Sequence, residues 1–147
     1  MLGTIAIACD HAGLPLKQEL LEVLEAEGHT VVNLGTDTPD SVDYPDYAHA
    51  MAAALADGRA EQGVLVCGSG IGISIAANRH SNVRAALVDG SLAAEMARKH
   101  NDANVVCFGA RMIGPETAKQ AMLTFLKTDF EGGRHARRVE KLTKPSP

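Results

Sequence analysis

The chain has 147 residues, of which 46% are hydrophobic and 22% are charged, and its formal net charge is −4. This length and composition are typical of one globular domain with its own core. The small negative charge offers no attractive field for nucleic acid, and no apolar run reaches the roughly 18–20 residues that span a bilayer. Three cysteines without a CxxC spacing, and no basic segment before the first apolar run, favour a reduced, cytoplasmic protein.

Apolar runs of strand length alternate with helical patterns along the chain. Strands are expected over residues 4–9, 29–35, 63–67, 83–88 and 104–109. Helices are expected over residues 14–28, 46–58, 70–79, 91–101 and 114–130, and a short basic helix over 134–142 follows a glycine pair. Apolar, non-alternating strands joined by helices predict an α/β fold, a doubly wound (Rossmann-like or flavodoxin-like) domain with a five-stranded parallel sheet and helices on both faces. Residues 1–131 would form this domain, and residues 132–147 a C-terminal basic helical arm that reaches a neighbouring subunit.

The polar residues that follow the expected strands mark a candidate ligand site. In an open parallel sheet, ligands bind outside the carboxyl ends of the strands. The residues at these ends are Asp10 and His11, Asp43 and Tyr44, Cys67 to Ser69, Asp89, and Arg111. We therefore expect these side chains to converge on one rim.

Cys67 ends the third strand and is followed by glycines at 68, 70 and 72. A dinucleotide fingerprint and a C-x5-R phosphatase loop would need glycine and arginine, respectively, at position 73, where the chain has isoleucine. Loop amides and the start of the next helix would stabilise an anion or a developing oxyanion, and would favour a thiolate. A phosphometabolite- or nucleotide-binding module without catalysis, with Asp89 on a ribose, stays open. Cys9 and Cys107 have no such loop and are expected to be structural.

Six segments, taken in chain order, resemble the type B ribose-5-phosphate isomerase family. They are CDHAG (9–13), DYPDYA (43–48), CGSGIGISIAANR (67–79), RKHNDANV (98–105), FGAR (108–111) and EGGRHARRV (131–139). The resemblance runs from about residue 4 to residue 142, and the wider family includes galactose-6-phosphate and allose-6-phosphate isomerases. It implies isomerisation of an aldose phosphate to a ketose phosphate through a cis-enediolate, with no metal and no cofactor.

The resemblance also implies a role for individual residues. Cys67 would be the base, although one branch of the family places a glutamate base at the position of Ile73. Backbone amides of the loop would hold the enediolate oxygen, and the residues concerned are Gly68, Gly70, Ile71 and Gly72. Ser69 would assist proton movement, and either Asp10 or His100 would open the sugar ring. The phosphate ligands would be His11, Arg134 and Arg138, the further substrate contacts Asn101 and Arg111, and the pocket wall Tyr44.

His100 ends the helix before the last strand, so it is expected at the amino edge of the sheet. Cys67 is expected at the carboxyl edge, roughly 15–20 Å away. If both act on one sugar, His100 and Asn101 must come from a neighbouring chain, which predicts a homo-oligomer with shared sites and leaves a dimer and a tetramer open. His29, His49 and His80 are expected to be structural. The expected reaction joins ribose 5-phosphate and ribulose 5-phosphate in the pentose phosphate pathway, and allose 6-phosphate or galactose 6-phosphate is the alternative substrate.

Overall fold

The computed structural model describes residues 3–144, and its centre is a five-stranded sheet. The strands β1 (Thr4–Cys9), β2 (Thr30–Asn33), β3 (Gln62–Cys67), β4 (Ala85–Leu87) and β5 (Val105–Gly109) are all parallel, in the order β2-β1-β3-β5-β4. In the register of the sheet, Cys9 pairs with Val66 and Cys67 pairs with Gly109. The carboxyl ends of β1, β3 and β5 therefore lie side by side.

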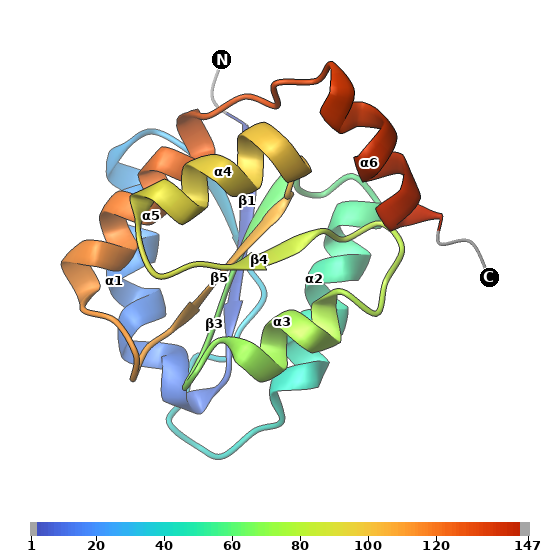
Figure 1. Ribbon diagram of the computed structural model, residues 1–147. Helices are drawn as coiled ribbons and strands as arrows, with labels where there is room; N and C mark the ends of the chain where they lie inside the picture. The colour runs from blue at the N-terminus through green and yellow to red at the C-terminus, as the bar shows by residue number, and fades with distance from the viewer. Residues whose placement is uncertain (1–2, 145–147) are drawn as a thin grey trace.

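Helices cover both faces of this sheet (Figure 1). One face carries α1 (Leu14–Ala26), α4 (Ser91–Asn101) and α5 (Pro115–Lys127), and the other carries α2 (Tyr44–Ala56) and α3 (Ile71–Ala77). The doubly wound α/β prediction is thus confirmed. The two faces arise because alternate residues of each strand point in opposite directions.

The core is built from small and branched aliphatic side chains on both sides of β3 and β5. Val64, Val66 and Phe108 pack toward α1 and α5, whereas Leu65 and Cys107 pack toward α2 and α3. All five are fully buried, as expected for strands covered on both faces. The uninterrupted apolar runs that predicted the sheet are explained by this double burial.

Several boundaries differ from the sequence-based expectation. The helix expected from residue 46 begins at Tyr44, because Pro45 fits the first turn of a helix, where no backbone donor is needed. Residues His11–Gly13, expected as a loop, form a short 3-10 helix capped by the Asp10 carboxylate, which accepts the Gly13 N–H at 3.0 Å. The strand expected over 83–88 shortens to Ala85–Leu87, and the Asn78 side chain exchanges two hydrogen bonds with Ala85 at its start.

The last helix, α6 (Arg134–Thr143), lies apart from the sheet and next to the C-terminal end of α4 (Figure 1). Its one buried residue is His135, and its other side chains are exposed or half-buried. The loop before it is held to α4 by the Glu131 N–H, which donates to the Lys99 carbonyl at 3.1 Å. No helix within residues 3–144 is long and apolar enough to cross a membrane.

Candidate active site

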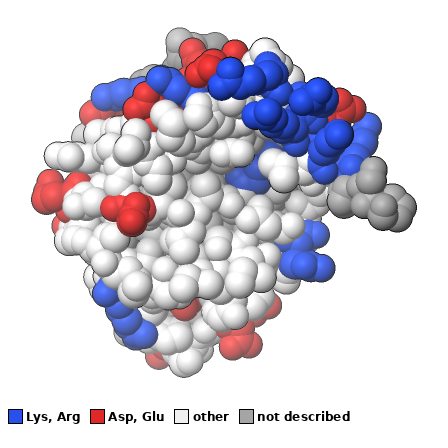
Figure 2. Space-filling view, viewed as in Figure 1, with Lys and Arg blue, Asp and Glu red and all other residues white. Residues whose placement is uncertain are grey.

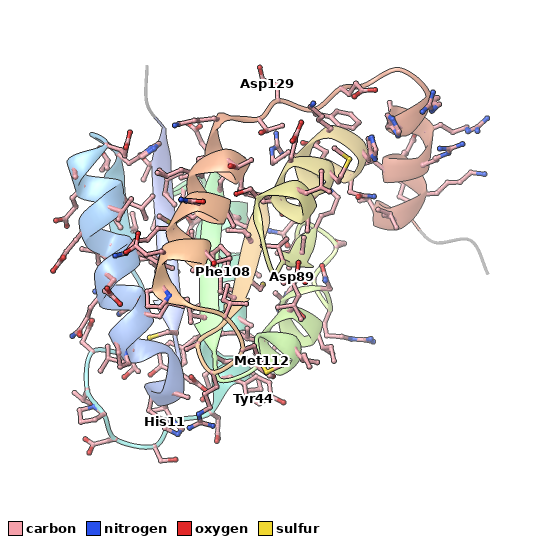
Figure 3. All side chains as sticks on the ribbon, turned by 60° about the vertical axis from the view of Figure 1, so that its left-hand side comes forward. His11, Tyr44, Asp89, Phe108, Met112 and Asp129 are labelled. Carbon is pink, nitrogen blue, oxygen red and sulfur yellow. The ribbon has the colours of Figure 1, made fainter. Side chains whose placement is uncertain are left out.

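A cavity of about 510 Å³ opens at the carboxyl ends of β1, β3 and β5. Its lining residues are Asp10, His11, Ala12, Tyr44, Cys67, Gly68, Ser69, Ile71, Gly72, Arg111 and Met112. From β1 the chain crosses to β2, toward one edge of the sheet, and from β3 it crosses to β4, toward the other edge. The cavity lies between β1 and β3, where the direction of these crossovers reverses. Ligands of doubly wound sheets bind at such a switch point. Figure 3 shows the labelled His11, Tyr44 and Met112 gathered at this end of the molecule.

Cys67 lies at the floor of this cavity and is only 4% exposed. Its sulfur accepts a hydrogen bond from the Gly70 N–H at 3.1 Å. The loop can curl back to the sulfur because Gly70 adopts a left-handed conformation with φ of +77°. A Cβ at this position would lie 2.8 Å from the Phe108 carbonyl carbon, so only glycine fits between the loop and β5.

The rest of the loop is held by its own side chains and by the end of β5. The Ser69 hydroxyl accepts the Ile71 N–H at 3.1 Å, and the Gly68 carbonyl accepts the Arg111 N–H at 2.9 Å. The Tyr44 ring packs directly over Gly72, where a Cβ would be 2.6 Å from the ring. The loop is therefore fixed before any ligand arrives, with a thiol, a hydroxyl and a guanidinium around it.

Asp10 and His11 form the side of the cavity that follows β1. The Asp10 side chain is buried, and its backbone N–H donates to the Val66 carbonyl at 3.2 Å, which places it beside Cys67. His11 Nδ1 accepts the Val42 N–H at 3.1 Å. A ring nitrogen that accepts carries no proton, so the proton of the neutral ring is on Nε2. His11 therefore offers the cavity a hydrogen-bond donor suited to an anion.

The other two cysteines differ from Cys67 in their surroundings. Burial raises the pKa of the Cys9 thiol to about 11, partly offset by the nearby Lys17 ammonium. Burial also raises the pKa of Cys107, well above its ordinary value. Both therefore remain neutral thiols at pH 7, and neither lines the cavity, in keeping with the structural role expected for them.

Four of the expected site residues lie elsewhere in the chain's fold. Within residues 3–144, His100 and Asn101 end α4 and Arg134 and Arg138 belong to α6, and none of them lines the cavity of Cys67. Cys67 ends β3 at the opposite edge, one strand of six residues away, or roughly 16 Å. Asn101 instead lines a second cavity, of about 570 Å³, at the amino edge of the sheet.

The expectation that every strand end would contribute to one rim is wrong for two carboxylates. Asp89 follows β4, which is an edge strand separated from β3 by β5. It lines a separate, smaller hollow of about 290 Å³ that shares Ser69, Ile71 and Met112 with the cavity of Cys67. Figure 3 shows Asp89 well away from His11 and Tyr44. Asp43 precedes α2 and does not line the cavity of Cys67. Asp89 therefore lies near the glycine loop on its β4 side, but it does not line the cavity that holds Cys67.

Two lining residues were missed by sequence reasoning, Ala12 and Met112. Both directly follow a predicted rim residue, so their position was a usable signal. Neither has a polar side chain, and that is why they did not stand out. Met112 is 67% exposed and forms an apolar part of the cavity mouth.

Comparison with known proteins identifies the family to which the chain belongs. Residues 5–142 match the family model described as Ribose/Galactose Isomerase. The chain is 44% identical to ribose-5-phosphate isomerase B of Escherichia coli, over 95% of this chain and 93% of that protein. It is 42% identical to D-erythrulose-4-phosphate isomerase of Pectobacterium atrosepticum, over 95% of this chain and 92% of that protein.

A solved structure of a ribose 5-phosphate isomerase from Thermotoga maritima has the same fold. The two superpose with a TM-score of 0.95 at 44% identity, over 97% of this chain and 98% of that one. The six sequence segments that predicted the family all lie within the matched residues. The chain belongs to the ribose/galactose isomerase family.

Proposed function

We propose that the protein interconverts D-ribose 5-phosphate and D-ribulose 5-phosphate, with Cys67 as the base. The observation that carries this proposal is the Cys67 sulfur at the floor of a cavity, beside a rigid loop of backbone amides. Proton transfer between adjacent carbons needs one base and a group that stabilises the enediolate. The cytoplasmic pentose phosphate pathway is the setting we propose for this reaction.

The reaction runs on the open-chain sugar. The Cys67 thiolate takes the proton from C2, the C2–H electron pair forms the C1–C2 double bond, and the C1 carbonyl oxygen becomes the enediolate oxygen. The same sulfur then returns the proton to C1 while the O2 proton moves to O1, which yields the ketose. Ser69, whose hydroxyl lies in the cavity, assists the transfer between the two oxygens. Asp10, beside Cys67, is one of the two candidates for opening the furanose ring.

The loop from Gly68 to Gly72 supplies the amides for the enediolate oxygen. The Gly70 N–H is directed at the Cys67 sulfur and the Ile71 N–H at the Ser69 hydroxyl. A substrate oxygen would compete for these two donors as charge develops on it. Because the loop is already folded, little reorganisation accompanies the step, which is the condition for strong electrostatic stabilisation.

The phosphate would bind His11 from one chain and the α6 arginines Arg134 and Arg138 from another. Figure 2 shows basic side chains gathered over α6, and Arg134, Arg137, Arg138 and Lys141 are all exposed there. Arginine forks suit phosphate oxygens. Since α6 does not line the cavity of Cys67, we propose a homodimer in which each site combines Cys67 and His11 of one copy with His100, Asn101 and α6 of the other.

The surface near β4 supports such an assembly. Ile75 of α3, Leu87 of β4 and Leu92 of α4 are 60%, 43% and 71% exposed. They lie on elements that face the viewer in Figures 1 and 2, and Figure 2 shows few charged side chains over this face. Exposed apolar side chains on an uncharged face are typical of an interface.

Complementation tests the shared site. Cys67→Ala and His100→Ala chains, each expected to lose most of its activity alone, are unfolded together and refolded as a mixture. If the site combines two copies, each mixed dimer regains one intact site, so an equal mixture reaches about a quarter of wild-type activity. No recovery would refute the shared site without touching the role of Cys67.

A substrate panel tests the reaction itself. Purified protein is assayed with ribose 5-phosphate, allose 6-phosphate, galactose 6-phosphate and erythrulose 4-phosphate, with and without a chelator. We expect the highest kcat/KM for ribose 5-phosphate and no loss of activity on chelation. Cys67→Ser should lose turnover by orders of magnitude and still bind substrate, whereas Cys9→Ser, a matched control outside the cavity, should remain active. An active Cys67→Ser enzyme would overturn the base assignment.

A further inference from the structure

Three side chains with metal-ligating atoms meet where α4 ends and α6 begins. They are His100 at the end of α4, Glu131 in the loop between α5 and α6, and His135 in the first turn of α6. One ligand atom from each lies within 4.8 Å of the others. This group is at the far edge of the sheet from Cys67 of the same chain and does not line that chain's Cys67 cavity, although His100 would face the sugar site of the other copy in the proposed homodimer.

His135 brings a buried, unpartnered ring nitrogen to this cluster. Its side chain is 93% buried, and its Nε2 has no hydrogen-bond partner within residues 3–144. The Glu131 Oε1 atom is 3.6 Å from it, which is too long for a hydrogen bond. Buried ring nitrogens are nearly always satisfied, so the unpartnered Nε2 indicates a ligand between these groups.

The backbone fixes two of the three ligands. The Glu131 N–H donates to the Lys99 carbonyl at 3.1 Å, and the His135 N–H donates to the Gly132 carbonyl at 3.1 Å. The His100 and His135 rings stack with centroids 4.5 Å apart and an angle of 16° between their planes. The loop and helix that carry Glu131 and His135 are therefore held against the end of α4.

We propose that His100, Glu131 and His135 form a binding site for a divalent transition-metal cation of the zinc class. Tetrahedral coordination with bonds of about 2.0–2.1 Å places ligand atoms about 3.3 Å apart. The separation of 3.6 Å between Glu131 and His135 is close to this value. The wider separations close by rotation of Glu131, which is exposed, and of His100, which is half-buried. The His100 ring leaves its stack on His135 in doing so, because a cation lies in the plane of each imidazole that binds it.

The donor set selects the kind of cation. Two imidazoles and one carboxylate suit zinc, cobalt, nickel and copper, whereas magnesium and calcium prefer oxygen ligands throughout. The neighbouring charges partly oppose a cation, because α6 is basic and Lys99 lies close by. Lys99, however, donates to the Glu95 carboxylate, which balances its charge locally.

A cation here would inhibit the enzyme, and this consequence rests on the proposed function. His100 is the second candidate for ring opening and would serve the site of the other copy. A ring nitrogen that binds a cation can neither accept nor donate a proton, so occupancy removes His100 from the reaction. The cluster would then link isomerase activity to the concentration of free zinc.

Binding is measured on full-length, tag-free protein in the Cys67→Ser background, which removes the thiol as a competing ligand. We expect one Zn²⁺ per chain by calorimetry and intense visible absorption on adding Co²⁺, as four-coordinate sites give. Glu131→Gln and His135→Asn should weaken binding at least about tenfold, whereas His49→Asn and Glu140→Gln, control changes outside the cluster, should not. Circular dichroism confirms that each variant is folded. Equal binding by the Glu131→Gln, His135→Asn and parent proteins would overturn the site.

Activity then separates the site from its consequence. In the protein with Cys67 intact, Zn²⁺ should inhibit, chelator should restore the rate, and Glu131→Gln should need at least about tenfold more Zn²⁺ for half-inhibition. Inhibition unchanged in Glu131→Gln would show that the cation acts at Cys67, and would overturn the inhibitory role. Binding at the cluster without inhibition would support the site and count against the proposed role of His100.

Discussion

Replacing Gly70 by alanine tests the geometry around Cys67 most directly. Gly70 has φ of +77°, and the left-handed conformation costs a residue with a Cβ about 1–2 kcal/mol. The new Cβ would also lie 2.8 Å from the Phe108 carbonyl carbon and 2.9 Å from the Gly109 nitrogen. These are backbone atoms of a buried central strand, so they cannot move aside as a flexible side chain would. Overpacking of this kind adds about 1–3 kcal/mol.

Gly58→Ala is the matched control, because Gly58 has φ of +82° and a Cβ at this position would have no atom within 4 Å. It should lose only the conformational part, about 1–2 kcal/mol, whereas Gly70→Ala should lose about 2–5 kcal/mol in total. Urea unfolding at one fixed protein concentration measures both, and each kcal/mol lowers Tm by about 2–4 °C in a chain of this size.

Gly70→Ala and Gly58→Ala should also differ in activity. Gly70→Ala moves the N–H that donates to the Cys67 sulfur, so its kcat should fall even at temperatures where it is fully folded. Gly58→Ala should keep wild-type turnover, since Gly58 is remote from the cavity. If Gly70→Ala is no less stable than Gly58→Ala, the close packing of the loop against β5 is refuted.

Three further predictions use the same structure. His11→Ala should raise KM for the sugar phosphate by about 10–100-fold with a smaller effect on kcat, because a hydrogen bond to a charged group contributes about 1.5–3 kcal/mol. A fall in kcat alone, measured by steady-state kinetics, would contradict this prediction. Iodoacetamide at pH 8 should label Cys67 before Cys9, whose pKa of about 11 leaves about one thiolate in a thousand, and peptide mass spectrometry with and without substrate measures the order and the protection. Lys17→Met should cost at least about 2 kcal/mol at pH 7, because it removes the hydrogen bonds that the buried ammonium donates to Asn33, the Thr36 carbonyl and Asp37. The hydrogen bond from Lys17 lowers the pKa of Asp37 below its ordinary 3.8, so the stability that this pair adds to the wild type is complete above pH 3.8 and is lost as pH falls below it. If the difference in unfolding free energy between wild type and Lys17→Met is the same at pH 7 and pH 2.5, Asp37 makes no such contribution.

Much of the fold was predictable because the responsible signals are local. The apolar runs ending at Cys9, Cys67 and Gly109 have no alternation, and a strand buried on both faces needs none. The helical spacing between them then leaves little choice besides a parallel sheet with helices on both sides. Once strand ends are known, the rule for ligand sites in such sheets also predicts that Cys67, Asp10 and Arg111 lie near one another.

Element boundaries were less predictable, because they depend on contacts with distant segments. The strand expected to continue to residue 35 ends at Asn33, where the Lys17 ammonium donates to Asn33, Thr36 and Asp37 and holds the chain in a turn. Lys17 is 16 residues before Asn33 and is buried, and no pattern in the sequence marks it as different from the exposed lysines.

The sequence by itself determined the class of fold, the thiol beside a glycine loop, and the family. Only the tertiary structure decided that β5 lies between β3 and β4, which brings Arg111 to Cys67 and removes Asp89 from it. It also decided that the Gly70 N–H is directed at the sulfur and that His135 stacks on His100. The physical reason is that strand order, hydrogen-bond direction and ring stacking depend on how segments far apart in the chain pack together, whereas periodicity and glycine spacing describe each segment alone.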